Sequence, residues 1–143
     1  MKLLSLAGLA AMLAALLGLW KTRSLFSAHP GVIAVQLTAV LLMIWARVTF
    51  GLRSFHAAAN PTAGSLVTTG PYHFIRHPIY ASICLFLWAG VLGNLSPVAI
   101  SLGALATIGA LVRLFCEEHL LIRQYPKYRE YAASTRRLLP GVW

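Results

Sequence analysis

The 143-residue sequence contains no aspartate, and its only acidic residues are Glu117, Glu118 and Glu130. A Ser–His–Asp catalytic triad is therefore excluded, and no glycine-rich phosphate-binding loop is present either. Charged residues are scarce, at 10% of the chain against 59% hydrophobic residues, whereas soluble domains carry about 25% charged residues. The composition excludes an ordinary soluble domain and predicts an integral membrane protein.

Cysteine is also rare, since the chain contains only Cys84 and Cys116. Two cysteines make no disulfide framework and have no metal-ligand spacing. Each lies in or beside an apolar run, so we expect buried free thiols. The net charge of +9 is spread between apolar segments, which favours anionic membrane lipids over nucleic acid as the partner.

Four apolar segments predict an all-α membrane fold of about four transmembrane helices in a single domain, residues 1–143. They cover residues 3–20, 32–50, 79–93 and 97–114. A helix of about 18 residues measures about 27 Å, close to the ~30 Å hydrocarbon core of a bilayer. Residues 79–93 are short for a full crossing, so we expect this helix to tilt or to start in the interface.

The first apolar segment could also be a signal peptide, because Lys2 supplies a minimal basic start. No small-x-small cleavage site follows promptly, so we interpret the segment as a retained helix. Rows of small residues along it suit close helix packing. They are Ala7, Ala11 and Ala15, with Ala10, Ala14 and Gly18.

Two polar regions flank the last two apolar segments: a loop at residues 51–78 and a basic tail at residues 115–143. A loop of this length without evident structure is usually functional or disordered, and its aromatic and histidine residues argue for function. The fourth apolar pattern continues through "RLFCEEHLLIRQY". We therefore expect one long helix that leaves the membrane and stops before Pro126.

Lysine and arginine residues are distributed unevenly between the two sides that four crossings create. Arg53 and Arg76 lie on the same side as six further cations. These are Arg113, Arg123, Lys127, Arg129, Arg136 and Arg137. The opposite side holds only Lys21 and Arg23. In membrane proteins, lysine and arginine are enriched in the loops on the cytoplasmic side, so both termini are predicted to be cytoplasmic. The loop and the tail are then predicted to meet at the cytoplasmic surface of the membrane.

The first polar cluster is "GPYHFIRHPIY" at residues 70–80. Pro78 suits the first position of a helix and keeps His77 out of helical dihedrals. The third span is thus predicted to begin at Pro78, with its N–H groups beside Arg76 and His77 as an anion site. The Gly-Pro turn can bring Tyr72 over the same spot, and Tyr80 lies within the first helical turn.

The second polar cluster is "CEEHLL" at residues 116–121. Arg113 and Glu117 are four residues apart, which places them on one face of the long helix. Glu118 lies about 100° further around the helix. A cation and a carboxylate are thus predicted to face the first cluster at the membrane surface.

Each feature also has a purely structural interpretation. The Arg76–Pro78 triplet could be a basic anchor at the membrane surface, and Arg113–Glu117 could be a surface ion pair. His73 and His77 have helical metal-ligand spacing, but Pro78 breaks the helix that would align them, so no metal site is predicted. An interfacial aromatic belt is the simplest interpretation of Tyr125, Tyr128 and Tyr131.

The two clusters together narrow the choice. "LVTTGPYHFIRHPIY", followed two helices later by "RLFCEEHLL" and then "YPKYREY…RRLLP", resembles the isoprenylcysteine carboxyl methyltransferase family, with the related phospholipid methyltransferases. The resemblance covers roughly residues 64–140. It implies an all-helical membrane enzyme that uses S-adenosylmethionine, with the cofactor pocket at the cytosolic surface.

The resemblance also implies roles for individual residues. Arg113 matches the residue that positions the methyl acceptor, and Arg76 and Glu118 are possible supports. The positions that match cofactor contacts are Leu66, Val67, Tyr72, His77, Pro78, Tyr80 and Glu117. The family often has a histidine near the start of the "LVTTG" stretch, where this chain has Gly64 and Ser65.

The chemistry of these residues suits the implied cofactor. A helix N-terminus with His77 suits its carboxylate, Glu117 suits its ammonium or ribose hydroxyls, and tyrosine rings suit its sulfonium. The acceptor stays open: a prenylcysteine-like carboxylate is expected first, and a phospholipid amine or a small thiol are alternatives. A non-catalytic membrane binding or assembly module is the rival class.

Overall fold

The computed structural model describes residues 1–51 and 66–139, and within these ranges every regular element is helical. The all-α membrane fold predicted from the sequence is confirmed. Four helices form the body of the molecule: α1 (Lys2–Lys21), α2 (Pro30–Phe50), α3 (Pro78–Gly93) and α4 (Pro97–Gln124). Two short elements, the 3-10 helix η2 (Gly70–His73) and the helix α5 (Tyr128–Ser134), accompany them.

Among the described residues, α1, α2 and α4 are long and apolar enough to cross a membrane, with mean hydropathies of 2.2, 1.9 and 2.0. α3 is equally apolar in character but has only 16 residues, which is about 24 Å of helix. In α4 we take residues 97–114 as the membrane-spanning segment and residues 115–124 as its polar extension. The protein is therefore a membrane protein with three full-length spans and a shorter fourth helix.

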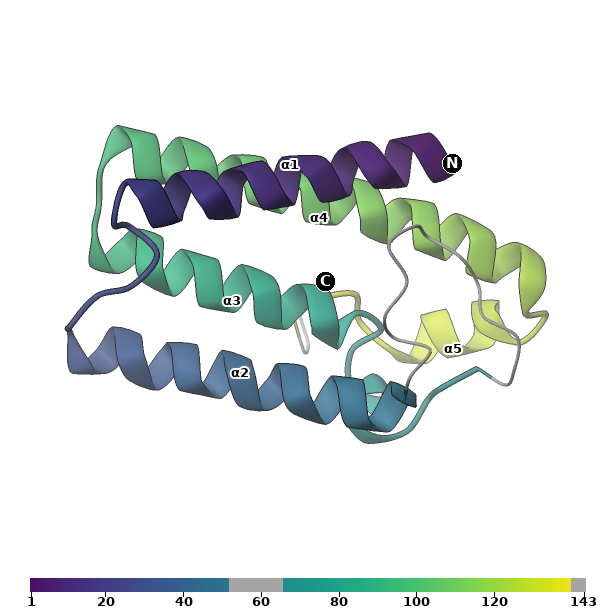
Figure 1. Ribbon diagram of the computed structural model, residues 1–143. Helices are drawn as coiled ribbons and strands as arrows, with labels where there is room; N and C mark the ends of the chain where they lie inside the picture. The colour runs from purple at the N-terminus through teal and green to yellow at the C-terminus, as the bar shows by residue number, and fades with distance from the viewer. Residues whose placement is uncertain (52–65, 140–143) are drawn as a thin grey trace.

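The four helices lie side by side with alternating directions (Figure 1). α1 packs along α4, and α3 lies between α4 and α2. The turns that join α1 to α2 and α3 to α4 lie at one end of the bundle. The start of α1, η2 and α5 lie at the other end, which we call the polar end.

Proline residues mark where the helices begin. Pro78 opens α3, as predicted, because its fixed φ suits the first helical turn. Pro97 opens α4, where the Ser96 hydroxyl accepts a hydrogen bond from the amide of Ala99 at 3.0 Å. α4 then continues as one helix to Gln124, before Pro126, so the predicted single long helix is also confirmed.

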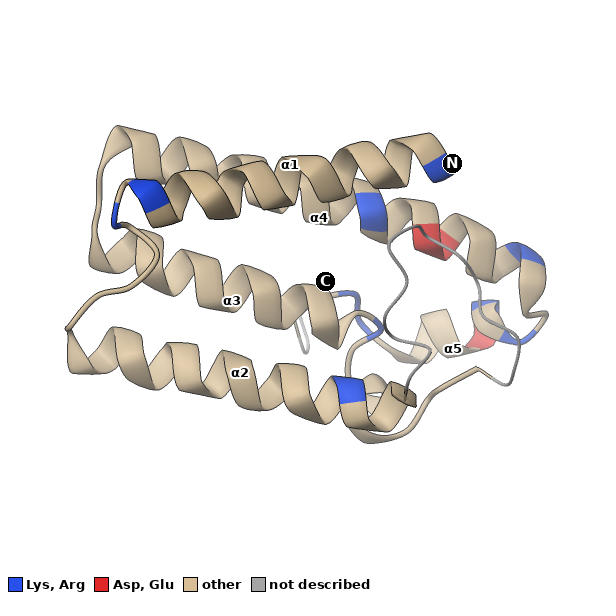
Figure 2. Cartoon of the chain, in the orientation of Figure 1, with Lys and Arg blue, Asp and Glu red and all other residues tan. Residues whose placement is uncertain are grey.

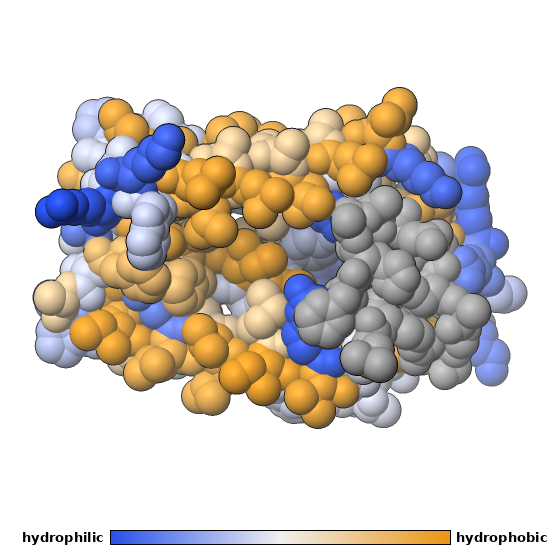
Figure 3. All heavy atoms as spheres, in the orientation of Figure 1, coloured by the Kyte–Doolittle hydropathy of each residue, from blue (hydrophilic) through white to orange (hydrophobic). Residues whose placement is uncertain are grey.

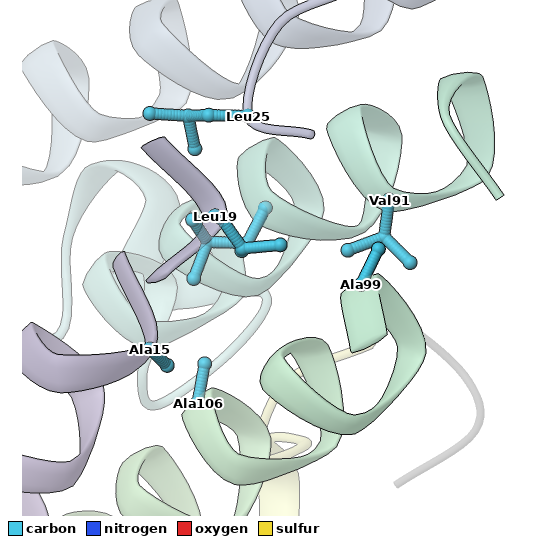
Figure 4. Packing of buried hydrophobic residues seen from close by; sticks show 7 residues of the cluster. Ala15, Leu19, Leu25, Val91, Ala99 and Ala106 are labelled. Carbon is cyan, nitrogen blue, oxygen red and sulfur yellow. The ribbon is translucent and has the colours of Figure 1, made fainter. Parts of the chain in front are cut away.

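The packing face of α1 differs from the predicted one. Only Ala15 of the small-residue rows is buried; the buried face consists of Ser5, Gly8, Met12, Ala15 and Leu19. Ala15 lies opposite Ala106 of α4 (Figure 4). A Cβ added to Gly8 would lie 2.8 Å from the backbone oxygen of Gly109, so the two backbones are in contact. This close approach sets the rotation of α1 about its axis.

Charge and hydropathy divide the bundle along its length. Apolar side chains cover the middle of the face in Figure 3, and hydrophilic ones gather at its two ends. All three acidic residues of the sequence are glutamates, and they lie at the polar end (Figure 2). The fold therefore brings the two polar clusters to one end of the helices, as their spacing predicted.

Candidate active site at the polar end

The segment before α3 is bound by the C-terminal tail. The amide of Arg76 donates to the carbonyl of Arg136 at 2.7 Å, and the amide of His77 donates to the carbonyl of Arg137 at 3.0 Å. Ile75 and Arg136 form a parallel bridge. The tail thus binds the two amides that precede α3, whereas the anion site predicted from the sequence uses the first N–H groups of α3 itself and stays a prediction.

Glu118 is the centre of an ion cluster that joins α4, the α3 start and the tail. Its Oε1 accepts from Arg76 Nε at 2.9 Å, and its Oε2 accepts from Arg137 Nε at 3.0 Å. The Arg76 guanidinium also donates to the carbonyls of Ala132 and Thr135. Arg76 therefore links α4 to the tail inside the protein. The interpretation of Arg76 as a basic anchor at the membrane surface is wrong.

Electrostatics holds the Glu118 carboxyl in its charged form. Burial alone would raise its pKa, but hydrogen bonds and charge from His77, together with hydrogen bonds from Arg137 and Arg76, lower the pKa to about 2. Its side chain is only 10% exposed. Glu118 is thus a charged carboxylate whose charge is balanced by two arginines. It is therefore suited to hold neighbouring side chains in place rather than to bind a ligand.

Glu117 has a different environment. Its side chain is 29% exposed, and its Oε1 accepts a short hydrogen bond of 2.5 Å from the Tyr80 hydroxyl. Arg113 Nη2 lies 3.9 Å from the same oxygen. Of the two adjacent carboxylates, Glu117 is therefore the one that combines exposure with a polar neighbourhood.

His77 lies between the two carboxylates. Its Nε2 is 3.4 Å from Glu118 Oε1, and its Nδ1 is 4.0 Å from Glu117 Oε2. The ring is buried and lies 5.9 Å from the Tyr80 ring, centroid to centroid. His73, by contrast, is an exposed residue that ends η2. The two histidines thus occupy different environments.

Arg113 is 6% exposed and has partners from α3, α4 and α1. Its Nε donates to the Tyr80 hydroxyl at 3.1 Å, and its Nη1 donates to the carbonyl of Ser5 at 3.2 Å. The Arg113 stem also lies against Gly8, since a Cβ there would be 3.0 Å from Arg113 Cγ. A guanidinium this deeply buried requires such partners, and α1 supplies one of them.

η2 positions Tyr72 at the edge of the same site. Gly70 has φ +58°, and an added Cβ would lie 2.7 Å from the Thr49 hydroxyl, so the turn requires glycine. Tyr72 packs on Phe50 at 5.5 Å, and its carbonyl accepts from the Tyr131 hydroxyl at 2.6 Å. Burial raises the pKa of the Tyr72 phenol, while the charge of Arg47 lowers it and the charge of Glu117 raises it.

The other residues predicted to contact the cofactor precede or open α3. Leu66 and Val67 are half-buried in the irregular stretch before η2, and Pro78 is buried at the start of α3. Arg53, Gly64 and Ser65, which entered the sequence prediction, lie outside the described residues. Cys116 is buried and Cys84 is half-buried, both as free thiols.

Several residues of the site were missed from the sequence. Arg137 and Ser5 bind the predicted residues directly, and Tyr131 bonds the Tyr72 backbone. Tyr128 is only 2% exposed, so the aromatic-belt interpretation is wrong for this residue. Nothing in the local pattern distinguished Tyr128 from its neighbours, because its burial comes from the fold of the tail.

An apolar cavity of about 350 Å³ lies beside the site, in the membrane-spanning part of the bundle. Its walls come from α1, α2 and α3, including Met12, Met43 and Ile83. Figure 3 shows this face hollowed between α1 and α2. Met12 belongs to the same buried cluster as Tyr80, and Ile83 packs against this cluster, so the cavity and the polar site share neighbours.

Comparisons with known proteins show the family of this chain. The nickel-cobalt-cadmium resistance protein NccN of Alcaligenes xylosoxydans xylosoxydans is 37% identical over 83 residues, covering 54% of this chain and 37% of that protein. The chain thus spans little more than a third of this relative. No solved structure matches. A phospholipid methyltransferase family model matches residues 28–128, which contain both polar clusters. The chain therefore belongs to the phospholipid methyltransferase family, which includes the isoprenylcysteine carboxyl methyltransferases.

Proposed function

We propose that this membrane methyltransferase takes its methyl group from S-adenosylmethionine and transfers it to a lipophilic acceptor. The observation that carries the proposal is the meeting of two sequence motifs at the polar end. The Tyr80 hydroxyl donates to Glu117, and His77 lies between Glu117 and Glu118. Both motifs lie within the family match.

The residues present fit this cofactor. Glu117 offers a carboxylate that is 29% exposed, which suits an ammonium group or ribose hydroxyls. Glu118 is already neutralised by Arg76 and Arg137, so it supports His77 instead. When bound, the cofactor supplies a methyl group on a cationic sulfur, and tyrosine faces attract such a cation. The proposed contacts are Leu66, Val67, Tyr72, His77, Pro78, Tyr80 and Glu117.

The cavity supports a lipophilic acceptor. Its volume of about 350 Å³ is within the range of small-molecule sites, and its lining is almost entirely apolar. It lies between spans and shares Met12 and Ile83 with the packing around Tyr80. An apolar chain there would keep its reactive head near the polar cluster.

Arg113 is the proposed positioning group for the head of the acceptor. A guanidinium fork fits a carboxylate in two-point contact, which favours carboxyl O-methylation of a prenylcysteine-like substrate. A carboxylate is already deprotonated, so alignment with the methyl carbon supplies most of the acceleration. A phospholipid amine or a small thiol are the alternative acceptors.

We also propose that both termini and the site face the cytoplasm. The polar end carries Arg76 and the basic tail, whereas the other end carries Lys21 and Arg23. This asymmetry follows the distribution of basic residues in known membrane proteins. The water-soluble cofactor then enters from the cytosol, and the acceptor enters from the bilayer.

Calorimetric titration of the purified protein with S-adenosylmethionine tests the cofactor assignment. The wild type is expected to bind saturably, and Glu117→Gln to bind at least about tenfold more weakly, a loss of ~1.4 kcal/mol. Glu130→Gln is the matched control, because Glu130 is an exposed carboxylate of α5. A wild type without saturable heat would support the non-catalytic module instead.

A further inference from the structure

Tyr128 is a buried polar residue at the polar end. It opens α5 and is 2% exposed. Within residues 1–51 and 66–139, its hydroxyl is a buried side-chain oxygen without any hydrogen-bond partner. Tyr131, one turn later, donates to the Tyr72 carbonyl at 2.6 Å. The two rings are 5.9 Å apart, so neighbouring tyrosines have opposite hydrogen-bonding states.

A buried hydroxyl without a partner is uncommon. More than about nine in ten buried polar groups in proteins have at least one hydrogen bond, because losing water without replacement is unfavourable. A phenylalanine would fill the same space without this penalty. The hydroxyl of Tyr128 therefore indicates a partner that does not belong to the described part of the chain.

The surroundings of Tyr128 point to the candidate active site. α5 is tied to the α3 start by Arg76, whose guanidinium donates to the carbonyl of Ala132. Burial raises the pKa of the Tyr128 phenol, the charge of Glu118 raises it further, and the charge of Arg76 lowers it. Because Arg76 also pairs with Glu118 at 2.9 Å, the helix that carries Tyr128 is held against the ion cluster of the site, and the phenol stays protonated at neutral pH.

We propose that Tyr128 is a further cofactor-binding residue, whose hydroxyl donates a hydrogen bond to an acceptor oxygen of S-adenosylmethionine. This inference rests on the proposed function. The cofactor offers such oxygens on its carboxylate and its ribose. The hydrogen bond forms only on binding, so the penalty of the unpartnered hydroxyl is relieved in the complex and contributes to affinity.

The test compares three Tyr→Phe variants, each of which removes one oxygen. Cofactor affinity is measured by calorimetry, and the unfolding midpoint is measured without cofactor. Tyr128→Phe is expected to keep or raise the midpoint while weakening affinity at least about tenfold. Tyr131→Phe is expected to lower the midpoint, because it leaves the Tyr72 carbonyl without this donor. Tyr125→Phe, the matched control for affinity, is expected to bind as the wild type does.

Two outcomes overturn the inference alone: wild-type affinity in Tyr128→Phe, or a fall in its midpoint as large as that of Tyr131→Phe. The second result would mean that the hydroxyl has a partner within the protein. If the wild type shows no saturable cofactor binding, the proposed function fails, and this inference fails with it. The wild-type isotherm therefore separates the two failures.

Discussion

Replacing Glu118 with glutamine is expected to release the C-terminal tail from the start of α3. The carboxylate accepts from Arg76 and Arg137 at 2.9 and 3.0 Å and lies 3.4 Å from His77. A glutamine has nearly the same shape, but it carries no charge. Its NH₂ group would face one of the two guanidinium donors, so one hydrogen bond would be replaced by a donor–donor contact.

The size of the effect follows from the ionisation of Glu118. Lowering its pKa from 4.5 to about 2 corresponds to roughly 3 kcal/mol of preference for the charged form in the folded protein. Breaking a buried ion pair typically costs about 3–5 kcal/mol. Because glutamine keeps one acceptor, we expect a loss of about 2–3 kcal/mol in tail docking, or roughly a 30- to 150-fold increase in local opening.

Hydrogen exchange at two amides measures this opening directly. The amides of Arg76 and His77 donate to the tail carbonyls of Arg136 and Arg137, so they exchange when the tail leaves. Glu118→Gln is expected to lower their protection by that factor, while Glu130→Gln leaves it unchanged. Equal protection in the wild type and Glu118→Gln would refute the role assigned to this carboxylate.

The same carboxylate predicts a pH dependence. Since its pKa is lowered in the folded state, its stabilisation is complete above pH ~4.5 and is lost as pH falls towards about 2. Protection of the Arg76 and His77 amides, corrected for intrinsic exchange, is expected to fall over this window in the wild type. Glu118→Gln lacks the titrating group, so a fall of the same size in this variant would contradict the assignment.

Three further predictions concern the bundle. Arg113→Lys is expected to keep cofactor affinity but to lower turnover at least about tenfold, ~1.4 kcal/mol, in kinetics with a fixed acceptor; unchanged turnover would make Arg113 structural. Gly8→Ala is expected to lower the unfolding free energy by about 1–3 kcal/mol, because the new Cβ would lie 2.8 Å from a backbone oxygen. Gly18→Ala, where the added Cβ meets only a side chain, is expected to cost less, and equal losses would argue against the backbone contact. Reporter fusions at Asn94 and at the C-terminus are expected on opposite sides of the membrane, and a shared side would overturn the orientation.

Local sequence signals were sufficient for the helices and for part of the site. The lengths of the apolar segments were enough to predict the membrane-spanning helices. The backbone restrictions of proline predicted that α3 starts at Pro78 and that α4 ends before Pro126. The helical repeat put Arg113 and Glu117 on one face, where their side chains are 3.9 Å apart. Such features depend on neighbours within one turn, so a single sequence reveals them.

Contacts between distant segments could not be predicted in the same way. Glu118 pairs with Arg76 across 42 residues and with Arg137 across 19, and no periodicity links these positions. The rotation of α1 also escaped prediction, because an alanine-rich helix offers several equivalent small-residue faces. The structure chooses the face with Gly8, whose contact with Gly109 lets the Ser5 carbonyl reach a buried guanidinium.

The most direct test of the account is methyl transfer from isotopically labelled S-adenosylmethionine to membrane extracts by the purified protein. The predicted result is a labelled, lipid-soluble product that depends on Glu117 and releases its label in mild base, as a methyl ester does. A base-stable lipid product would keep the methyltransferase and replace the carboxylate acceptor by an amine or a thiol. Absence of any saturable transfer by well-folded wild-type protein would contradict the central claim.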